Sequence, residues 1–235
     1  MSMSSSSSSS CGIFIVNYKD DERRQRMSQR VKSVGLDAHF VDPVSIEDSR
    51  IKDQPITAFE KRNWSIFFQH VDSMKNFVEN TTYDYCIICE DDVVLSRDLK
   101  VEIPQIISLY DQAQLDILLL SYLWPYEIPE NNYFPVLNKT EEWKIQGYPD
   151  DLWGAHMYFM SRNHAKTLVE RYTTEYAITN KEPFCTDWQF TKFGNRGLIV
   201  PMVGLEEGEV KTDHQGQIDF HRAVFNFHYK ADKFI

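Results

Sequence analysis

Runs of apolar residues alternate along this chain with segments in which apolar residues recur at helical spacing. The run Gly12-Ile-Phe-Ile-Val-Asn17 is short and β-branched, which is typical of a strand buried on both faces. Asp20 and Asp21 then supply an N-cap and an acidic first turn, and Gly35 supplies a C-terminal cap. The segment therefore predicts a strand, a short loop and a helix, whose inward residues are Met27, Val31 and Val34.

The same alternation continues through most of the chain and shows no internal repeat. Further strands are predicted at His39–Val44, Tyr85–Asp92, Asp116–Ser121, Gly154–Met160 and Leu198–Val203. Further helices are predicted up to Asn80, from Pro104 as a first helical residue, after the N-cap Ser161, and from about Thr186. Alternation of this kind predicts a single-domain α/β sandwich with a mainly parallel sheet.

One segment breaks the pattern. Between Leu123 and Leu152 four prolines lie among six tryptophan, tyrosine and phenylalanine residues. Long aromatic loops without secondary structure are uncommon in compact domains and often serve as binding loops or lids. We expect this segment to be such a loop.

Composition narrows the class of protein. The chain has 235 residues and no Pro/Gly-rich linker, so we expect one domain over residues 12–235, preceded by a flexible serine-rich leader over residues 1–11. The net charge of −10 argues against a broad nucleic-acid or anionic-membrane surface. No apolar run is long enough to span a membrane and no signal-peptide core follows Met1, so a cytoplasmic location is expected.

The four cysteines do not predict a secreted disulfide framework. Cys86 and Cys89 form a C-x-x-C sequence, but on a strand residues three apart point to opposite faces. The pair is therefore expected to be buried and not to chelate a metal.

The strongest chemical signal is the acidic triplet that ends the strand Tyr85–Asp92. Glu90, Asp91 and Asp92 repel one another, so stability alone gives little reason to place them where a buried strand surfaces. In open α/β sheets ligands gather at the carboxyl ends of strands, and oxygen ligands suit Mg²⁺ or Mn²⁺. The alternative is a solvated acidic turn, and the apolar residues on both sides of the triplet favour the metal site.

At these residues the sequence resembles a known family. Cys89-Glu90-Asp91-Asp92 looks like the E-D-D form of the DxD motif in glycosyltransferase family 25, the lipooligosaccharide and collagen galactosyltransferases of GT-A fold. Four other stretches agree with that family in order and spacing between about Gly12 and Gly216. They are Ile15–Asn17 with Arg23, Arg24 and Arg26; Ser65–His70, where only His70 is retained; Gly154–Tyr158 with Ser161, Arg162, Ala165 and Lys166; and Cys185–Asp187.

The resemblance implies roles for individual residues. Asp92 would ligate Mn²⁺ or Mg²⁺, which bridges the diphosphate of a UDP-sugar, while Glu90 or Asp91 would reach the ribose or a metal-bound water. A C-terminal histidine is expected to join the metal; we favour His214 over His221 and His228, because His214 lies in a polar loop. Asp187 is the expected base, with a helix N-cap as its alternative role. The rest of the donor site would include Asn17, Tyr18, Arg24, His70 and Gly154, although His70 also suits a satisfied core position.

These residues together predict a metal-dependent, inverting glycosyltransferase. It would move a hexose from a UDP-sugar to a hydroxyl group of a glycan or glycoprotein acceptor. One alternative is a non-catalytic domain that binds nucleotide sugars or carbohydrates. Another, a phosphotransferase of the haloacid dehalogenase type, needs a D-x-D-x-T signature at the first strand, and Ile15–Asp20 lacks it.

Overall fold

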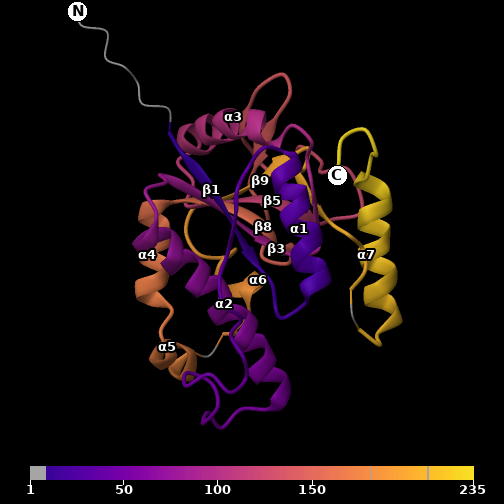
Figure 1. Ribbon diagram of the computed structural model, residues 1–235. Helices are drawn as coiled ribbons and strands as arrows, with labels where there is room; N and C mark the ends of the chain where they lie inside the picture. The colour runs from indigo at the N-terminus through magenta and orange to yellow at the C-terminus, as the bar shows by residue number, and fades with distance from the viewer. Residues whose placement is uncertain (1–8, 181, 211) are drawn as a thin grey trace, which may run out of the picture.

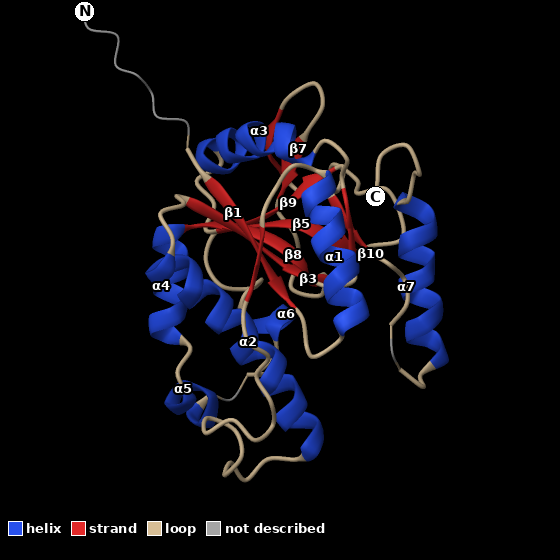
Figure 2. Cartoon of the chain, viewed as in Figure 1, coloured by secondary structure: helices blue, strands red, loops and turns tan. Residues whose placement is uncertain are grey.

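The computed structural model describes residues 9–180, 182–210 and 212–235. Its central feature is an eight-stranded sheet with the strand order β2-β1-β3-β8-β5-β9-β7-β6, flanked by helices (Figures 1 and 2). The strands are β1 (Cys11–Val16), β2 (Ala38–Phe40), β3 (Tyr85–Glu90), β5 (Ile117–Leu123), β6 (Val136–Lys139), β7 (Lys144–Gln146), β8 (Trp153–Ser161) and β9 (Arg196–Val200). A separate antiparallel pair joins β4 (Val93–Leu95) to β10 (Gly204–Glu206). The helices are α1 (Asp21–Ser33), α2 (Ala58–Asn80), α3 (Leu99–Gln112), α4 (Arg162–Arg171), α5 (Thr174–Thr179), α6 (Thr186–Gln189) and α7 (Gln215–His228).

Most strands of the large sheet run in one direction. β1 is parallel to both β2 and β3, and β5 is parallel to β9. β8 is antiparallel to both β3 and β5, and β7 is antiparallel to both β9 and β6, so only β8 and β7 are reversed among the described strands. The predicted α/β sandwich with a mainly parallel sheet is confirmed.

Two apolar layers cover the two faces of the sheet. On one face α1 contributes Met27 and α3 contributes Ile106; on the other α2 contributes Phe67 and α4 contributes Leu168. Cys86 is buried in the second layer and Cys89 in the first, which confirms that they point to opposite faces. Figure 1 shows α7 at the side of the molecule, where it packs against β10.

Several element ends follow from local sequence. The Asp20 carboxylate accepts the backbone N–H of Arg23 and so caps α1, as predicted, and Gly35 has φ +76° just after this helix. Thr57 and Glu60 form a capping box that starts α2. Ser161 caps α4 through the N–H of His164, also as predicted.

Four boundary predictions need correction. The strand predicted at Leu198–Val203 is β9, which runs from Arg196 to Val200. α3 begins at Leu99 after the N-cap Asp98, so Pro104 lies inside the helix and is not its first residue. The second strand is Ala38–Phe40, shorter than the predicted His39–Val44, because it pairs with only three residues of β1, Ile13 to Ile15. The predicted strand Tyr85–Asp92 ends at Glu90, and Asp91 and Asp92 form the turn into β4.

The aromatic segment 123–152 is only partly a loop. Its second half forms β6 and β7, and β7 pairs with β9 and so widens the sheet. Several of its aromatic rings are buried, among them Phe134, Trp143 and Tyr148. The prediction of a structureless lid is therefore wrong for this half, because its rings pack onto the sheet.

The predicted leader, residues 1–11, lies largely outside the described residues, which begin at residue 9. Its last two positions are ordered, because Cys11 begins β1 and the backbone N–H of Ser10 donates to the Asp84 carboxylate at 2.9 Å. Over the described part of the chain, no helix combines the length and the apolarity that a membrane crossing needs.

Candidate functional site

The acidic triplet lies at the carboxyl edge of the sheet, beside the end of β1. β1 and β3 are parallel and pair Val16 with Glu90, so Asn17 comes next to the triplet. The Asn17 amide Nδ2 donates to Asp91 Oδ2 at 2.5 Å and to the backbone carbonyl of Asp20 at 2.9 Å. Gln69 of α2 donates to the Asn17 carbonyl at 2.8 Å. Asn17 is thus fixed between the triplet, α1 and α2.

An arginine of α1 binds two of the three carboxylates. Arg23 Nη1 lies 3.1 Å from Asp91 Oδ1 and 3.0 Å from Asp92 Oδ2. Arg24, which was expected near the diphosphate, instead places its guanidinium 4.0 Å from the centre of the Phe40 ring. The arginine that the structure brings to the triplet is therefore Arg23.

One buried carboxylate oxygen of the triplet has no hydrogen-bond partner among the described residues. Asp92 Oδ1 is buried and, within the described ranges, accepts no hydrogen bond. Burial raises the pKa of Asp92 above its ordinary value, and the nearby imidazole of His156 opposes that rise. Burial also raises the pKa of Glu90, to about 8. Such an arrangement favours a proton or a cation at these oxygens.

His70 lies in the core beside the triplet. It is fully buried, and its Nδ1 lies 2.9 Å from the Tyr158 hydroxyl oxygen, whereas its Nε2 makes no hydrogen bond within the described residues. Its Nε2 faces Glu90 Oε1 at 3.5 Å. Burial lowers the pKa of His70 to about 3, so the ring is neutral at neutral pH.

Two residues that the sequence analysis did not assign to the site, His156 and Glu206, complete this cluster together with His221, which it ranked below His214. His156 lies on β8, where the pairing of Cys89 with Met157 sets it opposite Glu90. Glu206 ends β10, beside the turn that holds Asp92, and its Oε2 lies 2.9 Å from Nδ1 of His221 on α7. The rings of His156 and His221 are 6.3 Å apart. His156 could have been identified from the sequence, because it is a histidine in an otherwise apolar strand. No feature of the sequence around Glu206 indicates that this residue belongs to the site.

Asp187 has a defined structural contact. Its Oδ1 accepts the backbone N–H groups of Gly154 at 2.7 Å and of Ala155 at 2.9 Å. The N-cap of α6 is Cys185, so the alternative reading of Asp187 as an N-cap is wrong. Gly154 has φ +150°, and a Cβ there would lie 2.5 Å from Tyr122 Cα, so this position requires glycine. Asp187 therefore holds the start of β8 against α6.

The three candidate histidines occupy different places. His214 is the N-cap residue of α7 and is exposed, and the described contacts do not connect it to the triplet. His228 contacts the carbonyl oxygen of Trp124 through Nε2 at 2.7 Å. His221, through Glu206, is the one of the three that reaches the carboxylate cluster.

A small cavity of about 180 Å³ opens beside the triplet. Tyr18, Asp20, Arg23, Ile66 and Gln69 line it together with Glu90, Asp91 and Asp92. Tyr18 is half exposed at its rim. Across the described ranges, no three His, Cys, Asp or Glu side chains are arranged to hold a metal ion by themselves.

A mixed sheet with a buried carboxylate cluster where adjacent strands end is the layout of enzymes that bind ligands in the crevice at that edge. The family model described as Glycosyltransferase family 25 (LPS biosynthesis protein) matches residues 11–180. The match spans well over half of the chain, so this protein belongs to glycosyltransferase family 25. The matched region contains the triplet, Asn17, His70 and His156, whereas Asp187, Glu206 and His221 lie beyond it.

Similar solved structures cover most of the chain at low identity. They include a glycosyltransferase involved in the glycosylation of the major capsid of PBCV-1, at 10% identity and a TM-score of 0.45, with 90% of this chain and 98% of that chain covered. HddC from Yersinia pseudotuberculosis is 14% identical with a TM-score of 0.38, covering 89% and 78%. A UDP-glucose pyrophosphorylase complexed with UDP-glucose is 12% identical with a TM-score of 0.40, covering 93% and 99%. Among curated proteins, no sequence match was found.

Proposed function

We propose that this family 25 glycosyltransferase transfers a hexose from a UDP-sugar to a hydroxyl group of a glycan or glycoprotein acceptor, with inversion and with a divalent cation. One observation carries the proposal: the unpartnered oxygen of Asp92 lies in a buried carboxylate cluster beside the cavity at the ends of β1 and β3. A buried carboxylate oxygen without a partner is costly unless a ligand satisfies it.

The donor side of the proposal uses residues around that cavity. Tyr18 at the rim would face the nucleotide base, and Asn17 would hold Asp91 in place through its amide. Arg23, now paired with Asp91 and Asp92, can also reach a diphosphate and becomes the arginine of choice in place of Arg24. Glu90 or Asp91 would reach the ribose or a metal-bound water.

The residues present suit Mn²⁺ or Mg²⁺ as the cation. Mg²⁺ commonly binds through one or two carboxylates together with substrate phosphates, so a three-ligand protein cage is not required. Asp92 would be the principal ligand, with His221 or His214 as the histidine candidates; the contact of His221 with Glu206 favours His221. The bound ion would supply a Lewis acid that neutralises charge on the departing diphosphate.

Asp187 remains our candidate base. Its Oδ1 accepts two backbone N–H groups, which leaves Oδ2 to take the proton of the acceptor hydroxyl. As that proton leaves, the acceptor oxygen forms a bond to the anomeric carbon from the face opposite the diphosphate. The bond from the anomeric carbon to the diphosphate oxygen breaks, and its electron pair leaves with UDP.

Calorimetric titration with UDP tests the donor site. We expect measurable affinity with Mn²⁺, at least tenfold weaker binding without it, and a similar loss in Asp92→Asn. Asp98→Asn, which changes a carboxylate at the start of α3, is the matched control. Equal affinity with and without Mn²⁺, or unchanged affinity in Asp92→Asn, would contradict the proposal.

The variant Asp187→Asn tests the base. An asparagine side-chain oxygen can still accept both backbone N–H groups, so the melting temperature should change little, whereas transfer or UDP-sugar hydrolysis should fall at least a hundredfold. Unchanged turnover would remove Asp187 from this role. UDP-sugar binding without any turnover in the wild type would instead identify a binding domain.

A further inference from the structure

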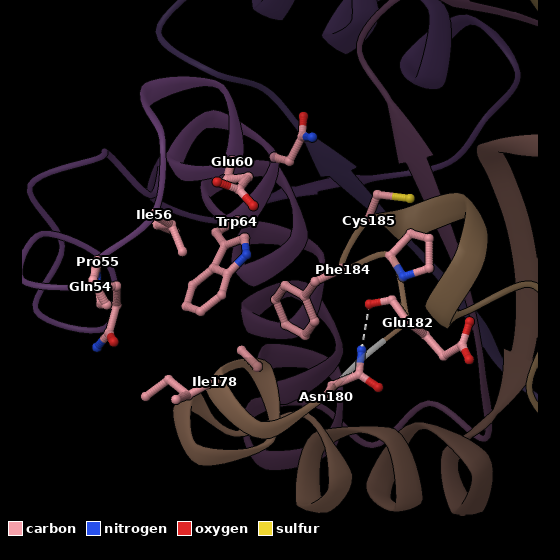
Figure 3. Close-up of a pocket in the computed structure, with 13 residues that line it drawn as sticks. Gln54, Pro55, Ile56, Glu60, Trp64, Ile178, Asn180, Glu182, Phe184 and Cys185 are labelled. Carbon is pink, nitrogen blue, oxygen red and sulfur yellow. Dashed lines mark hydrogen bonds between the residues drawn. The ribbon is translucent and has the colours of Figure 1, made fainter.

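A cavity of about 650 Å³ lies apart from the donor cavity, between the first half of α2, α5 and the segment 182–185 (Figure 3). Its volume falls within the roughly 300–1,000 Å³ of small-molecule sites. None of its described lining residues lines the cavity beside the triplet. It is therefore a distinct recess.

The lining combines aromatic surface with uncharged polar groups. Trp64 and Phe184 lie together in Figure 3, with ring centres 5.1 Å apart. Trp64 is only 5% exposed, Phe184 is partly exposed and presents the accessible ring, and Ile178 stands exposed at the edge. Asn63 and Asn180 add amide groups; Asn180 Nδ2 donates to the Glu182 carbonyl at 2.7 Å. Aromatic faces with a few amides suit the apolar C–H faces and hydroxyl groups of a sugar.

The charges of the lining select among ligands. Two carboxylates, Glu60 and Glu182, line the cavity, and its described lining includes no lysine or arginine. The hydrogen bonds from Thr57 lower the pKa of Glu60 below its ordinary value, so this group stays anionic. A diphosphate or a phosphorylated sugar would meet repulsion here, whereas a neutral or amino sugar would not.

The chain connects this cavity to the proposed reaction centre on two sides. Asn63 precedes His70 by seven residues, which places both on one face of α2 about two turns, or roughly 10 Å, apart. On the other side Cys185, a lining residue, is two residues before Asp187. The cavity therefore borders the short segment that carries Asp187.

We propose that the cavity formed by Asn63, Trp64, Ile178, Asn180 and Phe184 is the acceptor subsite, and that it takes an uncharged or amino-sugar saccharide. This inference rests on the proposed transferase function for its role, but sugar binding at the cavity can be measured separately. Glu60 and Glu182 at the cavity weaken the binding of phosphorylated acceptors.

The test is a titration of the full chain, followed by NMR, with lactose, methyl β-D-glucosaminide, glucose and glucose 6-phosphate. At least one unphosphorylated saccharide should bind, and Asn63→Leu should weaken that binding at least fivefold. Glucose 6-phosphate should bind at least fivefold more weakly than glucose, and Glu182→Gln should reduce that difference. The exposed residue Val101 of α3 provides the control Val101→Ser, which should leave all affinities unchanged.

Absence of binding by every saccharide, equal binding in Asn63→Leu, or tighter binding of glucose 6-phosphate than of glucose would overturn the inference. UDP affinity, measured in parallel, should be the same in Asn63→Leu as in the wild type. If the wild type binds saccharides at this cavity but not UDP, the proposed donor site fails while the sugar subsite stands. If the wild type binds UDP but no saccharide, the sugar subsite fails while the proposed donor site stands.

Discussion

At the scale of single residues, neutral side chains contact two of the three carboxylates of the triplet. The Asn17 amide lies between Asp91 and the Asp20 carbonyl, and the neutral ring of His70 faces Glu90. The sequence pointed to Glu90, Asp91 and Asp92 because they are adjacent and follow an apolar run. It could not point to Glu206, because only the pairing of β10 with β4 brings that carboxylate beside Asp92.

Replacing Asn17 by aspartate tests the contribution of the hydrogen bond from the Asn17 amide to Asp91. Asn17→Asp would set a second carboxylate within hydrogen-bond distance of Asp91 in a buried position, and the free energy of unfolding should fall by about 2 kcal/mol or more. Mn²⁺ should restore part of the loss. Urea denaturation measures both effects, with the exposed Asn163→Asp as control; equal losses in the two variants would contradict the argument.

A buried histidine away from the triplet predicts a dependence on pH. His164 is buried, and its Nδ1 lies 3.6 Å from Asp116 Oδ1. Burial lowers the pKa of His164 below its ordinary value, against the opposing effect of Asp116, so the unfolded chain binds the proton more tightly. The stabilisation is present above the ordinary pKa and is lost as the pH falls below it.

Acidification should therefore destabilise the wild type more than His164→Gln. Urea denaturation at about pH 7.5 and about pH 5 measures the difference between the two proteins. Asn163→Gln, which alters no titratable group, should follow the wild type. Equal losses of unfolding free energy in His164→Gln and the wild type would show that His164 does not contribute to the pH dependence of stability.

At the scale of elements, the strongest predictions came from strongly periodic segments. β1, α1, α2, β5, β8 and α4 were all located, because each buries several apolar residues at regular spacing. α7 was missed because Val224 is its only fully buried residue within the described chain, so it lacks a clear apolar stripe. β6 and β7 were missed because their pairing, and not their composition, defines them.

Arg162 links the start of α4 to the end of α2, a contact that the sequence motif around Arg162 did not indicate. α2 has no basic residue in its last turn, and Arg162, the first residue of α4, supplies the missing donors. Its Nη1 donates to the backbone carbonyls of Phe77 at 3.0 Å and Val78 at 2.9 Å. Its Nε donates to the backbone carbonyl of Tyr83 at 2.7 Å. The guanidinium also lies 4.5 Å from the Phe77 ring centre.

Arg162→Lys should lower the free energy of unfolding by about 2–4 kcal/mol, because a single ammonium group cannot replace a planar set of donors to several carbonyls. Chemical denaturation measures this loss. The exposed Arg222→Lys of α7 should change stability by less than about 0.5 kcal/mol. A similarly small effect at Arg162 would show that other groups satisfy the end of α2.

At the scale of the whole molecule, the site joins distant parts of the chain. Asn17 follows the first strand, His156 lies on β8, and Glu206 and His221 come from the last part of the chain. The sequence predicted the class of fold and the acidic centre, but not which C-terminal histidine approaches that centre. That choice depends on where α7 packs, which no local pattern records.

Ligand binding can decide between the two histidines. UDP with Mn²⁺ at about a hundred times its dissociation constant should stabilise the wild type by about 2.7 kcal/mol. We expect His221→Ala to lose most of this stabilisation and His214→Ala to retain it, as measured by thermal unfolding with and without ligand. The opposite result would assign the role to His214.

The antiparallel orientation of β8 has a consequence for the folding of the protein. Because β8 runs against β3 and β5, it is the entry of this strand, and not its exit, that delivers Gly154 and His156 to the carboxyl edge. β8 lies between β3 and β5, which both precede it in the chain, so its pairing joins the two halves of the sheet. Pairing over such long sequence separations is a slow event in folding. Because β8 carries His156, the complete carboxylate cluster depends on this pairing, and we expect it to form late in folding.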